Sequence, residues 1–103
     1  MAEPELLIAG WSDYAVGDAE LVFQRPSECA EISRGEEGCL AFSVTTDPSR
    51  PGRITVFERW VSTQQHSTHL STDHVKRYRE QVSAVHHLRR SLHRYLVSDS
   101  QEL

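Results

Sequence analysis

Apolar residues occur in four short runs that predict β-strands. The first run, residues 6–11, is apolar at odd and even positions alike, which is typical of a strand buried on both faces. Residues 39–46 and 53–61 form the next two runs. They flank a segment with two prolines and a glycine, residues 47–52, so the two strands are expected to form a hairpin. The fourth predicted strand covers residues 92–97.

A helix is predicted between the first two strands. Asp18 is a candidate N-cap, and the helical pattern extends to about Gly35. The apolar positions follow a helical spacing at Ala19, Val22, Phe23, Cys29 and Ala30. Pro26 lies within this pattern, so we expect a kink or two abutting helical pieces at that residue.

Two helical segments are predicted between the hairpin and the last strand. Ser62 and Gln65 have the spacing of a capping box, which predicts a short helix ending at His69 or Leu70. A second cap at Ser71 or Thr72 begins a longer helix, because apolar side chains recur three and four residues apart at Val75, Tyr78, Val82 and Val85.

The order strand, helix, strand, strand, helix, strand predicts an α+β protein of the ferredoxin-like βαββαβ type, with a four-stranded antiparallel sheet covered by helices on one face. The chain is interpreted as a single domain, residues 1–103, with a core at about 6–97 and a polar tail at 98–103. Because the strands are apolar on both faces, we expect the uncovered face to pack against a second copy, which makes a homodimer.

Composition removes several classes of protein. The net charge is −4, but residues 1–52 carry ten acidic and three basic side chains, whereas residues 53–103 carry five and eight. The basic stretch at residues 76–94 is a candidate nucleic-acid contact, although an acidic chain is a poor phosphate binder. No apolar run reaches the ~20 residues of a membrane span, and the acidic N-terminus does not resemble a signal peptide. Cys29 and Cys39 suit reduced core residues of a cytoplasmic protein.

Several short motifs stand in order along the chain: Arg25-Pro26, Glu36-Glu37-Gly38-Cys39-Leu40-Ala41-Phe42, Asp47-Pro48, Pro51-Gly52-Arg53, Phe57-Glu58-Arg59-Trp60 and His69-Leu70-Ser71-Thr72-Asp73-His74. Together they resemble the antibiotic biosynthesis monooxygenase (ABM) domain over roughly residues 6–97. The resemblance implies the dimeric α+β barrel fold. It also implies an enzyme that needs no flavin or metal and oxidises a quinol, phenol or anthrone-type aromatic with dioxygen, as in bacterial antibiotic biosynthesis.

The resemblance also suggests catalytic residues. Trp60 stands where the family has a tryptophan facing the pocket, and its ring suits stacking on an aromatic substrate with the N–H free to donate. His69 and His74 stand where the family often carries histidine, and an ordinary histidine, with a pKa of about 6.5, can accept a phenolic proton. The alternatives are a core tryptophan and two capping or solvent-facing histidines.

Four residues form the predicted substrate-binding set. Trp11 is a candidate for the opposite wall of the pocket, Phe23 for an apolar contact, and Tyr78 for a hydrogen-bond donor; core packing is the alternative role. Arg59 is a candidate to stabilise an enolate. Strand alternation places Arg59 on the face opposite Trp60, so a salt bridge across the dimer is an equal alternative.

Cofactor-dependent alternatives find less support. The histidines at positions 66, 69 and 74 invite a metal site, but no His-Glu-x-x-His motif is present, and we expect no metal. There is no Gly-x-Gly-x-x-Gly dinucleotide motif either. In the haem-degrading branch of the superfamily, the ligating histidine corresponds to Arg79 and a tryptophan to His69, so haem is not expected. The remaining alternative is a non-catalytic small-molecule binding protein on the same fold.

Overall fold

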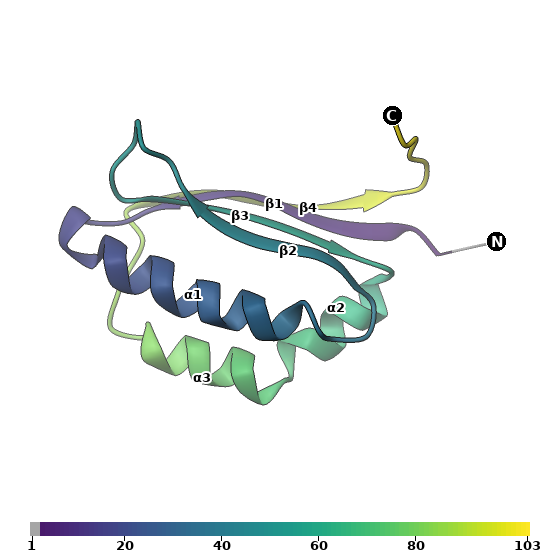
Figure 1. Cartoon of the computed structure of the whole chain (residues 1–103), viewed down its shortest axis with the longest axis horizontal. Helices are drawn as coiled ribbons and strands as arrows, with labels where there is room; N and C mark the ends of the chain where they lie inside the picture. Colours follow the sequence, from purple (N-terminus) through teal and green to yellow (C-terminus); the bar gives the residue numbers. More distant parts are fainter. Residues whose placement is uncertain (1–2) are drawn as a thin grey trace.

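The chain forms a four-stranded antiparallel sheet with its α-helices on one face (Figure 1). The computed structural model describes residues 3–103. The elements in chain order are β1 (Glu5–Asp13), a short 3₁₀ helix η1 (Val16–Asp18), α1 (Ala19–Ser33), β2 (Cys39–Thr46), β3 (Arg53–Trp60), α2 (Thr63–Leu70), α3 (Asp73–Gln81) and β4 (Arg89–Val97).

The strand order β2-β3-β1-β4 confirms the ferredoxin-like α+β prediction. β1 is central and pairs antiparallel with β3 and β4, so that Ile8 lies opposite both Glu58 and Arg94. Gly10 of β1 lies beside β4 with φ 149°, and a Cβ there would collide with the Ser91 carbonyl oxygen. Glycine at this position therefore allows the two strands to approach closely.

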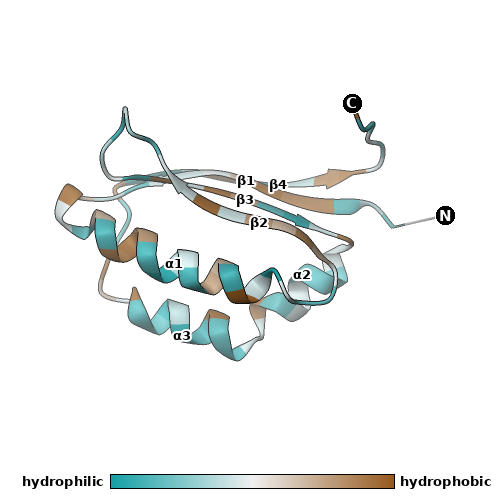
Figure 2. Ribbon diagram, in the orientation of Figure 1, coloured by the Kyte–Doolittle hydropathy of each residue, from teal (hydrophilic) through white to brown (hydrophobic). Residues whose placement is uncertain are grey.

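The two faces of the sheet differ in what covers them. Even-numbered side chains of β1 and β3 point toward the helices, and Leu6, Ile54 and Trp60 are buried there. Odd-numbered residues such as Leu7 and Ala9 point to the opposite face, which no element of residues 3–103 covers, and they are half-buried. In Figure 2, the brown of hydrophobic residues marks parts of strands β1 and β2 as well as parts of α1. The expected burial of β1 on both faces is thus not achieved within one chain.

Helix α1 is continuous, so of the two alternatives predicted at Pro26, a kink or two abutting pieces, the second is wrong. Proline removes one backbone N–H donor, a local loss. Val22, Cys29 and Ala30 are buried on the same side of the helix, and this packing outweighs that loss. The Ser27 hydroxyl also donates to the Phe23 carbonyl at 2.6 Å.

The α2 N-terminus confirms the predicted cap, because the backbone N–H of Gln65 donates to Ser62 Oγ at 3.3 Å. Thr72 is the N-cap residue of α3. The prediction for α3 was too long, since the helix ends at Gln81. The prediction for β4 was too short, because the strand begins at Arg89. The N–H of Leu88 already donates to the Asp13 carbonyl at 2.7 Å, which aligns the chain with β1 earlier than the apolar pattern indicates.

Candidate functional site

A cavity of about 430 Å³ lies between the sheet and the helices. Its walls are mainly apolar and come from β1, α1, β2, β3 and α3: Ile8, Val22, Val44, Ile54, Val56 and Val75. A largely apolar cavity with a few polar groups is the usual form of a small-molecule site. The polar groups of this cavity gather at two ends.

At one end, a buried carboxyl group lies among aromatic rings. Glu58 of β3 is 8% exposed, and its Oε1 accepts the indole N–H of Trp60 at 3.0 Å. Nε2 of His66 lies 4.0 Å from the same oxygen. Burial raises the pKa of Glu58, a rise that the Trp60 hydrogen bond only partly offsets. Burial likewise lowers the pKa of His66, helped by the neighbouring His69 and Arg94. Both shifts favour uncharged groups at this end.

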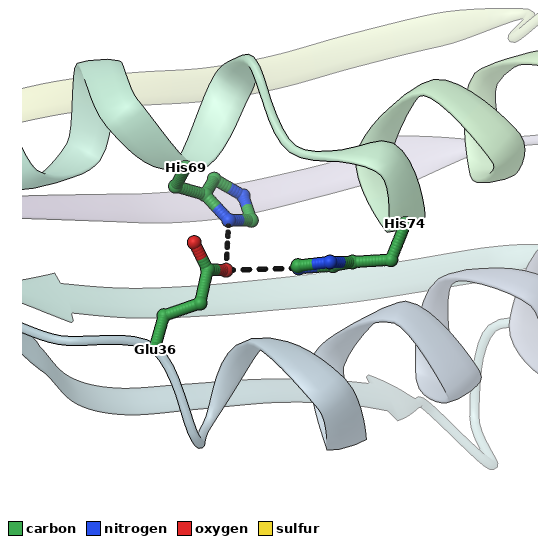
Figure 3. A group of neighbouring side chains, drawn as sticks. All are labelled: Glu36, His69 and His74. Carbon is green, nitrogen blue, oxygen red and sulfur yellow. Dashed lines mark hydrogen bonds and ion pairs between the residues drawn. The ribbon is translucent and has the colours of Figure 1, made fainter.

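His69 lies on the cavity wall, and its ring is held by a hydrogen bond with the Glu36 carboxylate (Figure 3). Its Nδ1 lies 2.6 Å from Glu36 Oε2, and the same oxygen lies 2.9 Å from Nε2 of His74. Burial tends to raise the pKa of Glu36, but the hydrogen bonds with the two histidines outweigh it and lower the pKa. Glu36 is therefore a carboxylate at neutral pH and can only accept, so Nδ1 of His69 carries the proton. The other ring nitrogen, Nε2, points away from Glu36 in Figure 3.

The loop between α1 and β2 places Glu36. The N–H of Glu36 donates to the Ser33 carbonyl at 3.0 Å, and the N–H of Cys39 donates to the Glu36 carbonyl at 3.2 Å. Gly38 has φ 82°, and a Cβ there would lie 2.5 Å from the Gln65 side chain. Glycine thus permits both the turn and the close packing of this loop on α2.

The same three side chains are the one set of candidate metal donors within residues 3–103. One atom each from Glu36, His69 and His74 lies within 4.8 Å of the others. Ligands around a tetrahedral zinc ion would be spaced by about 3.3 Å, given bonds of about 2.0–2.1 Å. The observed 2.6 and 2.9 Å separations are those of N–H···O hydrogen bonds. The cluster fits shared protons better than a metal ion.

The second polar end of the cavity is basic. Arg90 of β4 donates from Nε to Ser12 Oγ at 3.0 Å, and Arg79 and Tyr78 of α3 also line this end. Burial raises the pKa of Tyr78, so its hydroxyl stays protonated and can donate a hydrogen bond.

The predicted catalytic residues lie together, although in different roles. His69 lines the cavity, and His74 reaches the site only through Glu36. Trp60 is fully buried and is absent from the cavity wall. Its ring packs 4.7 Å from that of His69, and its N–H is engaged by Glu58 rather than free for a substrate. Trp60 thus positions Glu58 by a hydrogen bond and His69 by ring packing, without contacting the cavity itself.

Of the predicted substrate-binding residues, Tyr78 alone lines the cavity. Phe23 is half-buried on α1 outside its wall. Trp11 lies on the uncovered face of the sheet, with the Arg53 guanidinium 3.6 Å from its ring centroid, and so is not the opposite wall. Strand alternation explains this, since Trp11 is an odd-numbered residue of β1.

Arg59 also lies on the uncovered face, as its parity predicts. It pairs within the chain, because Nε and Nη2 donate to the two carboxylate oxygens of Glu5 at 2.6 and 3.0 Å. The expected contribution to an enolate is not possible from this face, and the alternative salt bridge is intramolecular.

Two acidic residues of the site had no role in the sequence-based predictions. Glu58 carries a signal that can be recognised, since residues 58 and 60 of one strand share a face. Glu36 comes from a loop 33 residues before His69, and no local pattern connects the two.

The fold and cavity place the chain among ferredoxin-like α+β proteins with a small-molecule pocket between sheet and helices. More specifically, the chain belongs to the antibiotic biosynthesis monooxygenase family, whose model matches residues 15–81. A comparison with curated proteins found no match.

Solved structures share the architecture. A Deinococcus radiodurans protein whose name assigns it to the antibiotic biosynthesis monooxygenases is 21% identical, with a TM-score of 0.82 over 95% of this chain and 97% of that one. Rv0793 from Mycobacterium tuberculosis is 16% identical, with a TM-score of 0.82 over 95% and 99%. At this identity the likeness establishes the fold. Within residues 3–103, no helix has the length and apolarity needed to cross a membrane.

Proposed function

We propose that the protein is a cofactor-independent monooxygenase that oxidises a quinol, phenol or anthrone-type aromatic with dioxygen. Family membership and an apolar cavity of about 430 Å³ support this reaction class. The observation that carries the proposal is the Glu36–His69 pair. In the neutral imidazole, a carboxylate that accepts Nδ1–H of His69 leaves the lone pair on Nε2, on a residue that lines the cavity.

In the proposed reaction with an anthrone, Nε2 of His69 takes one proton from the reactive methylene. The substrate anion gives one electron to dioxygen, and the resulting radical and superoxide join through a new C–O bond. The peroxide anion takes the proton back from His69. Loss of the second proton from the same carbon then breaks the O–O bond and expels hydroxide, which leaves as water with that proton. One methylene and one dioxygen give one carbonyl and one water.

The remaining groups of the cavity suit this chemistry. Apolar walls exclude water, which favours transfer of an electron from a desolvated anion to dioxygen. The Tyr78 hydroxyl, kept protonated by burial, is a donor for the oxygen of the substrate that gains charge.

We also propose that a second copy of the chain covers the open face of the sheet. Phe57 and Tyr95 are 38% and 48% exposed there. The charged side chains beside them are paired within the chain, Arg59 with Glu5 and Arg53 with Asp13, which lowers the cost of removing this face from water. Sedimentation at micromolar concentration should give twice the chain mass, and a monomer would contradict this assignment.

Oxygen uptake tests the catalytic proposal. Chelator-treated, flavin-free protein is mixed with anthrone, and dioxygen loss above the uncatalysed rate is followed together with anthraquinone formation. His69→Ala should lower the rate about 10²- to 10⁴-fold, the usual loss of a general base. The control is His86→Ala, an exposed histidine between α3 and β4 that does not line the cavity. Tight binding of aromatics without any oxygen uptake would favour the alternative, a non-catalytic small-molecule binding protein.

A further inference from the structure

The two polar ends of the cavity are separated along the strands. Ile8 of β1 pairs with Glu58, whereas Ser12 pairs with Arg90 of β4. Four residues of an extended strand span about 13 Å. The proton-accepting end and the basic end are therefore far enough apart to contact opposite sides of a fused-ring ligand.

In the part of the chain that the structure describes, the two arginines at the basic end lack the carboxylate partners that four other arginines have. Four arginines elsewhere form ion pairs with carboxylates: Arg25, Arg53, Arg59 and Arg89. Within residues 3–103, no carboxylate lies within ion-pair distance of Arg79 or Arg90, although both line the cavity. Because both residues are largely exposed, they stand where the cavity opens to solvent.

Arg90 is oriented rather than free to rotate. Its Nε donates to Ser12 Oγ at 3.0 Å, and Ser12 is only 7% exposed. This bond leaves the two outer guanidinium nitrogens available. A planar guanidinium fork recognises a carboxylate with two parallel hydrogen bonds.

We propose that this basic end binds a carboxylate, so that the substrate is an aromatic acid. Its rings occupy the apolar cavity and its carboxylate pairs with Arg90, while the carbon to be oxidised faces His69 at the other end. The assignment of the reacting end rests on the proposed function, but recognition of the carboxylate does not.

Equilibrium binding of redox-inert probes tests this inference without turnover. The probes are anthracene-2-carboxylate and its neutral match, anthracene-2-carboxamide, titrated by fluorescence. The wild-type protein should bind the carboxylate at least about 10-fold more tightly. Arg90→Gln should abolish that preference and leave carboxamide binding unchanged. Arg89→Gln is the matched control. Arg89 is next to Arg90 in the chain, but it points to the uncovered face and pairs with Asp13.

Each outcome of these titrations either supports or overturns the proposed carboxylate site. Equal affinity of the wild-type protein for the two probes overturns the inference, as does a preference that survives in folded Arg90→Gln protein. If Arg90→Gln does not fold, Arg79→Gln and a salt titration of the wild-type protein replace it. Added salt should then weaken binding of the carboxylate alone. If the protein consumes oxygen with neutral anthrone but shows no preference for the carboxylate probe, this inference is overturned and the proposed function stands. If it prefers the carboxylate probe but consumes no oxygen, only the proposed function is overturned.

Discussion

The two faces of the sheet differ in whether their charged side chains have partners of opposite charge. On the uncovered face, Asp13 takes hydrogen bonds from Arg53 at 2.7 and 3.0 Å and from Arg89 at 3.1 Å. On the helix-covered face, Glu58 is nearly buried with a single indole N–H as its hydrogen-bond donor, and Arg90 has no carboxylate partner within residues 3–103.

This difference separates groups that stabilise the sheet from groups available to a ligand. A carboxylate held by arginines is already satisfied and offers little to a substrate. A buried carboxyl or histidine whose pKa is shifted toward the uncharged form is not held in its charged form by an ion pair and can exchange a proton with a ligand. Such groups concentrate at functional sites. The faces can be compared by substituting matched residues on each.

The largest effect is expected from neighbouring leucines on opposite faces. Leu6 is fully buried under the helices, so Leu6→Ala should lower the free energy of unfolding by about 2–5 kcal/mol. Leu7 is half-buried on the open face, and Leu7→Ala should act mainly on dissociation of the proposed dimer. Denaturant unfolding and sedimentation measure the two quantities. Equal losses of stability without any change in dimer dissociation would contradict the division of roles.

The next effect concerns the support of His69. Glu36→Gln keeps a hydrogen-bond acceptor but removes the charge, and we expect kcat/KM for anthrone oxidation to fall about 10- to 100-fold. Glu37→Gln is the matched control, since this neighbouring side chain is exposed. An unchanged kcat/KM in folded Glu36→Gln protein would contradict the role of the Glu36 charge in supporting His69.

Sequence patterns predicted the order of the strands, the Ser62 cap and the face of Arg59 because these depend on residues close in the chain. Ser62 and Gln65, for example, are three residues apart and meet as predicted. The site depends on tertiary approach, which such patterns do not contain. Glu36 meets His69 only after α1 and α2 pack on one face, and the Trp60 N–H is occupied because Glu58 shares that face. Trp11 was misplaced because a tryptophan suits a pocket and an arginine-covered sheet surface equally well.

A smaller effect is expected at Glu58. Burial raises the pKa of this carboxyl in the folded protein above the unfolded value of about 4.3, so the folded state holds the proton more tightly. Wild-type stability should therefore fall as pH rises from that unfolded value through the folded pKa. Glu58→Gln keeps an acceptor for Trp60 and removes this loss. Its melting temperature should exceed that of the wild type at pH 7 and match it near pH 4. A variant less stable than the wild type at pH 7 would show that the charge is favourable.

The smallest effect belongs to the paired carboxylate on the open face, and it has the opposite sign. The Arg53 hydrogen bonds hold the pKa of Asp13 at about 2, below the ordinary value of 3.8. Its contribution to stability is fully present above the unfolded pKa and is lost as pH falls through about 2. Asp13→Asn should lower the melting temperature slightly at pH 7, and the difference from the wild type should close between pH 4 and pH 2. Asp99→Asn, in the exposed C-terminal tail, is the control. A difference that stays constant down to pH 2 would mean that Asp13 acts through packing against Arg53 rather than through its charge.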